Sequence, residues 1–478
     1  MEGQKIKRFS RCSHIFKLTT VAITGLALFW LAPPMVHQLE HLCPARPDGV
    51  TQVYALPSFA REYHMSCEQC HYAFPVLNAF GRQFKMNGYV VVPGSDQGVL
   101  QSQDKELWTE KLFPWAAIIR SRPFDDGKGG VANQGGQMGG TASPNTNGFK
   151  IQAINDVDMF VAGGDAARQV SFFGEMDANA PGGFSPGLGD IRLGYHPSLY
   201  FNAVAMRRGF FADDPYQTIV SNETPTIANR ATDLLFNDQG SISGNQMVST
   251  PQTLEVYGQY SLPIIQNSFL YYSGAAYKNA DSGTQASAPT NGAARLAWDD
   301  TGNTGLMLGT FGTYGHEGPM AAAGASSGAP GLSVAGPGGE LTQFVRGGFD
   351  ALWEHGNFAA RAAFVYSHDE DPAVRGAVAT DRAAYAEVAY KYLRNDNLYP
   401  FLMPLVRENW YTTFNGAQQF NYLTFQLAHY FAANLKAFVE YSLDTKRAYQ
   451  GGSLAAQGSD GTSQPLGNRV SLQAEVGF

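Results

Sequence analysis

Apolar and polar residues alternate along much of this chain, and the alternation is cleanest at its C-terminal end. Between Asn468 and Phe478, apolar side chains occupy every second position and polar side chains occupy most of the positions between them. An extended chain with this period has one apolar face and one polar face. A strand of this kind that ends on an aromatic residue is typical of the lipid-facing closing strand of a transmembrane β-barrel.

Segments of the same kind, alternating or rich in aromatic residues, recur along the chain. The expected strands are 113–123, 149–162, 168–178, 189–195, 198–208, 252–261, 268–279, 292–299, 304–314, 342–354, 357–367, 381–393, 398–410, 418–431, 435–445 and 469–478. They number about sixteen, an even count within the range of single-chain barrels. We therefore expect an all-β fold, a transmembrane β-barrel of about sixteen antiparallel strands formed by residues 108–478.

The connections between these strands alternate in length. Short turns, such as those at 163–165 and 196–197, are separated by long polar stretches at 124–148, 209–251, 315–341, 368–380 and 446–468. In outer-membrane barrels the short turns face the periplasm and the long loops face the outside. We expect the chain to lie in the lipid of the bacterial outer membrane, with periplasmic termini and extracellular long loops.

The N-terminal region predicts export. Basic residues precede an apolar run from Leu18 to about Met35, which is the order found in a signal peptide. A retained membrane anchor is the alternative. Residues 53–55 (Val-Tyr-Ala) fit a small-residue cleavage pattern, so we assign residues 1–55 to an export signal and leader.

Composition agrees with short strands and excludes one class of partner. The chain has 53 Gly, 23 Tyr and 31 Phe, and only 15% of its residues are charged. This favours strands and loops over long helices. The formal net charge of -8 argues against nucleic acid as a partner, because phosphate binding needs a basic surface.

Residues 67–71 read Cys-Glu-Gln-Cys-His, the attachment motif of a c-type haem. In such a motif Cys67 and Cys70 would each form a thioether to the porphyrin, and His71 would be the proximal iron ligand. A zinc site would need a second ligand pair, and a thioredoxin-like motif would lie in an α/β pattern that is absent. We expect a single, covalently attached haem c.

The residues after the motif predict a short helix. Pro75 suits its first turn, Leu77, Phe80 and Phe84 recur at helical spacing, and Gly88 can close it. The haem segment, residues 56–107, is too small to bury much surface alone. We expect it to plug or cap the lumen and to depend on the barrel for stability.

The sixth ligand of the haem iron is left open by the sequence. Met86, His64 and Met65 are candidates, and a residue of the barrel wall is another possibility. A thioether ligand would raise the reduction potential, whereas a second imidazole would lower it. Met86 also fits a role in core packing, and His64 fits an ordinary surface position.

Charged residues suggest a wet lumen and one further candidate site. In several strands charged side chains alternate with apolar ones, as expected for a polar inner wall. A predicted outer loop carries a run of groups that could hold a divalent cation: His368, Asp369, Glu370 and Asp371. Such a run is more often simply a solvated loop.

The haem segment resembles a known family. Residues 56–61 (Leu-Pro-Ser-Phe-Ala-Arg), the haem motif, 80–85 (Phe-Gly-Arg-Gln-Phe-Lys) and 88–89 (Gly-Tyr) are similar to the fused outer-membrane cytochrome–porins of iron-oxidising bacteria. The resemblance implies a mono-haem segment joined to a porin-like barrel, with Fe(II) oxidase activity. It also implies that Cys67, Cys70 and His71 bind the haem. The long leader before Cys67 departs from the family pattern.

These features predict an electron conduit. We expect it to oxidise extracellular Fe(II) at the haem, as an Fe(II):cytochrome c oxidoreductase, and to pass the electron to a periplasmic c-type cytochrome or another soluble carrier. Alternatives are a haem-tagged porin or transport channel, a conduit for a donor other than iron, and a scaffold that passes electrons between periplasmic proteins.

Overall fold

The structure is a computed structural model. It describes residues 59, 63, 65, 67–91, 115–125, 150–165, 169–179, 185–220, 225–226, 230–232, 252–265, 267–278, 290–317, 342–370, 378–393, 400–413, 418–432, 434–449 and 468–477. The chain divides into two units, Met1–Gln52 and Val53–Phe478, and the described residues belong to the second. The expected export signal or anchor, the cleavage site, His64, Asp371 and Phe478 lie outside the described residues.

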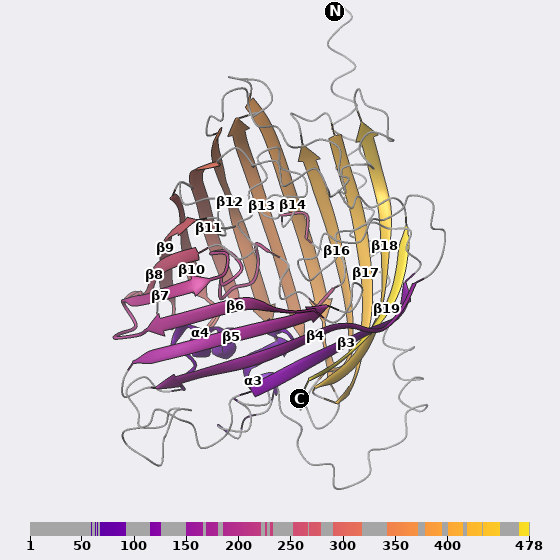
Figure 1. Ribbon diagram of the computed structural model, residues 1–478, viewed down its shortest axis with the longest axis horizontal. Helices are drawn as coiled ribbons and strands as arrows, with labels where there is room; N and C mark the ends of the chain where they lie inside the picture. Colours follow the sequence, from indigo (N-terminus) through magenta and orange to yellow (C-terminus); the bar gives the residue numbers. More distant parts are fainter. Residues whose placement is uncertain are drawn as a thin grey trace, which may run out of the picture. The chain divides into compact units, whose positions relative to one another are not determined.

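Antiparallel strands form a closed barrel (Figure 1). They are β3 (Trp115–Asp125), β4 (Lys150–Asp165), β5 (Val170–Asn179), β6 (Ser185–Tyr195), β7 (Asn202–Arg207), β8 (Gln252–Ser261), β9 (Phe269–Lys278), β10 (Asn291–Asp300), β11 (Leu306–Glu317), β12 (Thr342–His355), β13 (Phe358–Glu370), β14 (Val378–Tyr390), β15 (Tyr392–Leu393), β16 (Pro400–Thr413), β17 (Gln418–Ala432), β18 (Leu435–Tyr449) and β19 (Arg469–Gly477). The two-residue β15 continues β14 along β16, which leaves sixteen long strands.

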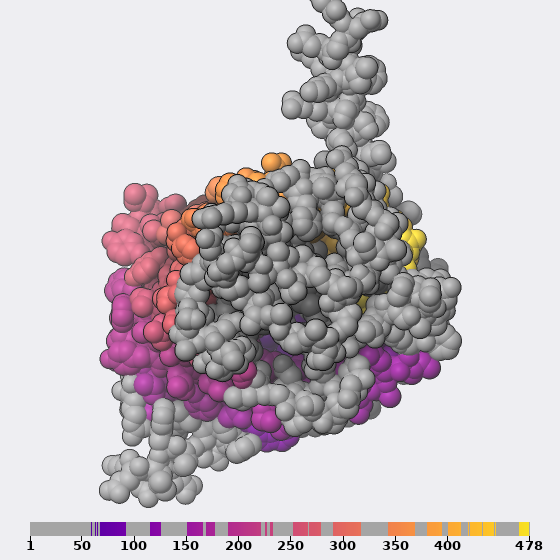
Figure 2. All heavy atoms as spheres, turned by 45° about the horizontal axis from the view of Figure 1, so that its top comes forward, coloured from indigo at the N-terminus to yellow at the C-terminus, as the bar shows by residue number. Residues whose placement is uncertain are grey.

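The ring closes where β19 pairs with β3. Figure 2 turns the upper end of Figure 1 forward and shows the colours of successive strands following one another around the wall. Each predicted strand overlaps one of the sixteen, so the predicted fold class is confirmed. Among the described residues, no helix is both long and apolar enough to cross a membrane.

Side chains alternate between the two sides of the wall, as the sequence predicted. In β8, Glu255 is 5% exposed, whereas Leu254 and Val256 beside it are 66% and 42% exposed. In β19, Ser471 and Gln473 are buried and Leu472 between them is exposed. The polar face therefore points into the barrel and the apolar face points outward, as a lipid-facing wall requires.

One predicted outer loop behaves differently. The segment between β7 and β8 was expected outside, but its described residues, 208–220, 225–226 and 230–232, are buried inside the barrel. We call these residues the lumen loop. Phe211 and Ile219 pack on inward side chains of the wall, including Phe311. The described part of this connection is therefore not a solvated loop, because burying its apolar side chains is favourable. The side of the membrane that this end of the barrel faces stays a prediction.

The residues of the haem motif form a small helical segment inside the barrel. We call residues 67–91 the motif segment, which contains α3 (Cys67–Cys70), β1 (His71–Ala73), β2 (Val76–Leu77) and α4 (Ala79–Met86). Figure 1 shows α3 and α4 in indigo toward the lower end of the barrel. This is the short-turn end, where β4 joins β5, β6 joins β7 and β12 joins β13.

The predicted helix is present but begins later than expected. Asn78 is its N-cap, and its side chain accepts a hydrogen bond from the Gly81 amide at 2.9 Å. Pro75 lies in the turn between β1 and β2 rather than in the first turn of α4. Phe84 is buried, whereas Phe80 is 39% exposed. Gly88 follows the helix with a φ of +71°, which favours glycine and confirms the predicted C-terminal stop.

Candidate functional site

Cys67, Cys70 and His71 lie at the junction of α3 and β1. Cys67 is 3% exposed and His71 is 8% exposed, while Cys70 is partly accessible. No disulfide joins the two thiols. Burial raises the pKa of Cys67 to about 12 and that of Cys70 to about 11, so without a bond to haem both thiols would be neutral near pH 7.

The orientation of His71 fits a haem ligand. Its Nδ1 lies 3.0 Å from the carbonyl oxygen of Pro75. Because a carbonyl can only accept, Nδ1 carries the proton and donates it, which leaves Nε2 with the lone pair that binds iron. The donor set therefore fits a c-type haem: Cys67 and Cys70 would hold the porphyrin, and His71 would ligate its iron.

Helix α4 is fixed directly against the motif. The Asn78 amide donates to the Cys70 carbonyl at 3.0 Å, and the Asn78 side chain donates to the Glu68 carbonyl at 2.8 Å. A Cβ at Gly81 would lie 1.9 Å from the same Cys70 oxygen. The backbone of α4 can approach α3 this closely only because residue 81 has no side chain.

One side of the motif segment is anchored to β16, β17 and β18. Tyr72, Ala73 and Val76 share a buried apolar cluster with wall residues, including Met403. Lys436 donates to the Phe74 carbonyl at 3.0 Å and pairs with Glu475 at 2.9 Å. These contacts hold the turn that carries the acceptor of the His71 hydrogen bond.

The opposite side is anchored to β6 and β8. Arg192 donates to the Tyr89 hydroxyl at 3.3 Å, and the Tyr257 hydroxyl donates to the Met86 carbonyl at 2.7 Å. The Gln259 amide also donates to the Met86 sulfur at 2.9 Å. The motif segment therefore reaches both sides of the short-turn end, in agreement with the expected plug.

The candidate distal ligands have different outcomes. Met86 is buried, but its sulfur contacts Gln259 in a cluster with Tyr216 and Tyr257, which gives it a packing role. Met65 is half-buried, and His64 lies outside the described residues. Iron ligation by any of the three stays a prediction.

His196, a half-buried histidine in the turn after β6, has a structural role. His196 contacts Ser171 through Nε2 at 2.7 Å and Asn202 through Nδ1 at 3.1 Å. Burial and the nearby Arg192 lower the pKa of His196 to about 4, so it is neutral at pH 7. A Cβ at Gly88 would lie 2.4 Å from this ring. The motif segment can therefore pack this closely against His196 only because residue 88 is glycine.

The lumen loop meets the motif segment from inside the barrel. The Gln217 side chain accepts a hydrogen bond from the Leu77 amide at 2.9 Å. Asp213 pairs with Lys85 of α4 at 3.3 Å and with Arg192 of the wall at 3.0 Å. These cations hold the pKa of Asp213 below its usual value despite its burial. The Asp213 carboxylate thus links the lumen loop, the motif segment and the barrel wall.

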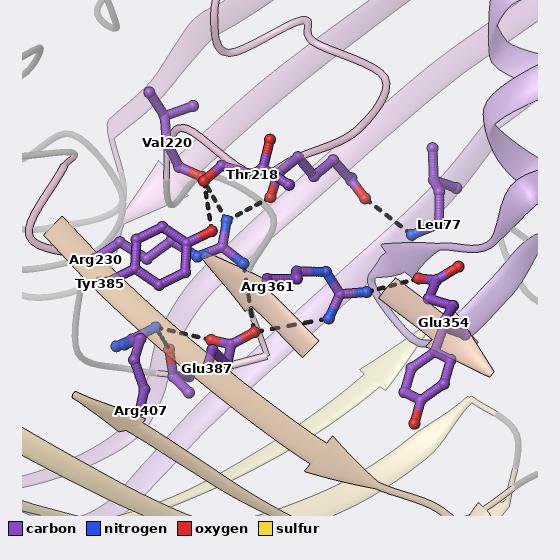
Figure 3. A network of polar contacts seen from close by, with 12 residues as sticks. Leu77, Thr218, Val220, Arg230, Glu354, Arg361, Tyr385, Glu387 and Arg407 are labelled. Carbon is purple, nitrogen blue, oxygen red and sulfur yellow. Dashed lines mark hydrogen bonds and ion pairs between the residues drawn. The ribbon is translucent and has the colours of Figure 1, made fainter. Parts of the chain in front are cut away.

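A second polar network runs from the lumen loop along the wall toward the plug (Figure 3). Glu387 lies within ion-pair distance of Arg230, Arg361 and Arg407, at 3.5, 3.7 and 3.3 Å. Arg361 also pairs with Glu354 at 2.8 Å, and Glu354 pairs with Arg82 of α4 at 3.2 Å. The chain of ion pairs therefore connects the lumen loop to the motif segment.

The predicted cation loop is partly strand. His368, Asp369 and Glu370 end β13 instead of lying in a loop, because their ladder with β14 continues to Val378. Among the described residues, no group of three or more His, Cys, Asp or Glu side chains could hold a metal ion. A site that includes Asp371 stays a prediction.

Sequence reasoning missed the residues that hold the plug. The motif segment is contacted from the wall and the lumen loop by Arg192, Asp213, Gln217, Gln259 and Glu354. Alternation alone shows that such side chains face inward, but it does not show which of them contact the motif segment. A usable signal was present at 210–220, where aromatic and branched apolar residues interrupt a stretch otherwise read as an outer loop.

Comparison with known proteins concerns the barrel. No protein-family model and no curated protein matches the sequence. Among solved structures, the anion-selective porin from Comamonas acidovorans has a TM-score of 0.50 and 8% identity, over 76% of this chain and 98% of that chain. OmpT of Vibrio cholerae has a TM-score of 0.47 and 8% identity, over 76% and 98%. OmpF of Salmonella typhi, in complex with daunomycin, has 0.46 and 14%, over 76% and 97%. The chain therefore has a porin-like, sixteen-strand barrel fold.

Proposed function

We propose that this protein conducts electrons across the bacterial outer membrane through a single c-type haem. Cys67 and Cys70 would attach the haem, and His71 would ligate its iron. The observation that carries the proposal is the enclosure of this motif in the short-turn end, with the Nδ1 proton of His71 donated to the Pro75 carbonyl, as in a histidine that ligates a metal through Nε2. The haem supplies the redox chemistry, and the chain supplies its orientation and surroundings.

The barrel gives the haem an insulated position. Outward positions carry exposed apolar side chains such as Leu308 and Phe349, which suit lipid. We place the short-turn end and both termini in the periplasm, with the long loops outside. The plug then faces a periplasmic carrier, and an external donor approaches from the loop end through the lumen.

We propose Fe(II) as the donor, on the resemblance of the haem segment to the cytochrome–porins of iron oxidisers. Fe(II) gives up a single electron, which matches the capacity of a single haem. The acceptor would be a periplasmic c-type cytochrome or another soluble carrier. The activity would then be that of an Fe(II):cytochrome c oxidoreductase.

Two alternatives remain distinct. A haem-tagged porin or transport channel is favoured by the porin-like fold. It would need an open path past the motif segment and the lumen loop, which meet at Gln217 and Leu77. The second alternative is an electron conduit for a donor other than iron.

Anaerobic mixing of Fe(II) with the oxidised protein, followed by the haem absorbance at the pH of its source, tests the proposal. We expect reduced haem bands in the wild type and none in the Cys67→Ser/Cys70→Ser variant. Reduction by dithionite but not by Fe(II) would point to another donor. A stable, large conductance of the intact holoprotein in planar bilayers would favour the channel.

A further inference from the structure

Arg82 is a buried cation whose hydrogen-bonding capacity is only partly used. The residue is 1% exposed. Its Nη1 donates to the Leu77 carbonyl at 3.0 Å and to Glu354 at 3.2 Å. Its Nε and Nη2 have no hydrogen-bond partner. Leaving the buried donors of a charged group without partners is costly, so a ligand that accepts hydrogen bonds from them would be favoured.

The two unpartnered donors have the geometry of a carboxylate site. Nε–H and Nη2–H lie parallel along one edge of the guanidinium plane, and this fork matches the two oxygens of a carboxylate. The carboxylate already present, Glu354, is on Nη1 instead. Glu354 is also shared, because its other oxygen accepts from Arg361 at 2.8 Å (Figure 3). Arg82 therefore keeps two buried N–H donors without partners on one edge of its guanidinium.

This side chain lies next to the haem motif. Leu77, which accepts from Arg82, is the strand partner of His71. Gly81, the preceding residue, meets the backbone of Cys70. The guanidinium of Arg82 thus lies close to the residues that would hold the haem. A c-type haem carries carboxylates of its own, the two propionates.

We propose that Arg82 binds a propionate of the haem through Nε and Nη2, while Nη1 holds Glu354 and Leu77. The inference rests on the proposed haem attachment and is independent of the electron donor. A fixed positive charge beside the porphyrin opposes the extra positive charge of ferric iron. Arg82 would therefore raise the reduction potential as well as hold the porphyrin in place.

The test uses the haem-loaded full-length barrel and two readouts, the midpoint potential and the propionate bending band in the resonance Raman spectrum. Arg82→Met should shift the reduction equilibrium at least tenfold toward the oxidised haem, about 59 mV for a single electron. It should also shift the propionate band. Arg82→Lys keeps the charge but lacks the fork, so it should change the band while keeping most of the potential.

Arg469→Lys is a matched control, because Arg469 is a buried arginine that pairs with Asp125 on the wall. It should change neither readout. If Arg82→Met fails to assemble, the Arg82→Lys spectrum decides. A propionate band that is identical in wild type and Arg82→Lys overturns the inference. Absence of covalent haem from the wild type would instead refute the proposed haem attachment, so the two failures are distinguishable.

Discussion

The Cβ position of Gly81 lies 1.9 Å from the carbonyl oxygen of Cys70, so α3 and α4 meet backbone to backbone. A side chain at residue 81 would prevent this approach. The Cys70 carbonyl also accepts a hydrogen bond from the Asn78 amide. The local fold of the haem motif therefore depends on the absence of a side chain at residue 81.

Gly81→Ala should displace α4 from α3 and disturb the motif segment. We expect less haem-loaded barrel and faster proteolysis within the segment. Gly174→Ala is the control, because the nearest atom to its Cβ position is the Val161 carbonyl oxygen at an ordinary 3.8 Å. Equal haem content and protease resistance in the two variants would contradict the proposed packing.

Replacing Cys67 and Cys70 together by serine should abolish haem staining after denaturing electrophoresis, because both covalent links to the porphyrin are removed. The barrel should still assemble, since its wall is formed by β3–β19 without these residues. A control is His355→Asn, which changes an exposed histidine on the rim and should leave staining intact. Haem that stays attached in the double variant would refute the site.

Asp213→Asn should loosen the plug, because it leaves Lys85 and Arg192 buried without their shared carboxylate. Breaking a buried ion pair from one side costs about 3–5 kcal/mol. Hydrogen exchange of the α4 amides should rise by a factor of about 100 or more. Combining Asp213→Asn with Lys85→Met should cost less than the sum of the single changes. Additive effects would mean that the pair does not hold the plug.

Asp214, the neighbour of Asp213, should make the stability of the folded barrel depend on pH. Burial raises the pKa of Asp214 from its usual 3.8 to about 6, and the pairing with Arg295 opposes this shift. Between these values the folded state binds more protons than the unfolded state, so the contribution of Asp214 to stability grows as pH falls from 7 toward 4.

Asp213 has a lowered pKa, so its contribution is retained over that window and is lost only at lower pH. The denaturation temperature of the barrel should therefore depend on pH between about 7 and 5 through Asp214. Asp214→Asn should remove this part of the dependence. A wild type and an Asp214→Asn variant with identical pH profiles would contradict the assignment.

Much of the fold could be predicted because a barrel wall repeats a simple rule. Exposed Leu254 and buried Glu255 obey the same alternation as Leu472 and Gln473, so strands could be located one by one. The interior follows no such rule. The inward course of the lumen loop depends on contacts such as Phe211 with Phe311, which join residues far apart in sequence.

The candidate site likewise has a part that could be predicted from the sequence and a part that could not. Cys67, Cys70 and His71 could be identified from their spacing, because haem attachment is local chemistry. The partners Asp213, Glu354 and Gln259 could not, because each comes from a different part of the barrel and only its closure brings them to α4. The predicted position of Pro75 in the helix was wrong because Asn78 caps α4 more effectively.

In the proposed function, the barrel carries an electron from one side of a membrane to the other through its haem. The most direct measurement uses liposomes that contain the haem-loaded protein and enclose oxidised soluble cytochrome c, with Fe(II) added anaerobically outside. The account predicts reduction of the enclosed cytochrome c with the wild type and only the background rate of empty liposomes with the Cys67→Ser/Cys70→Ser barrel. Equal rates for wild type and variant, both above the rate of empty liposomes, would show that iron passes through the pore without using the haem. No reduction by wild-type protein whose haem is accessible to dithionite would contradict the Fe(II) conduit.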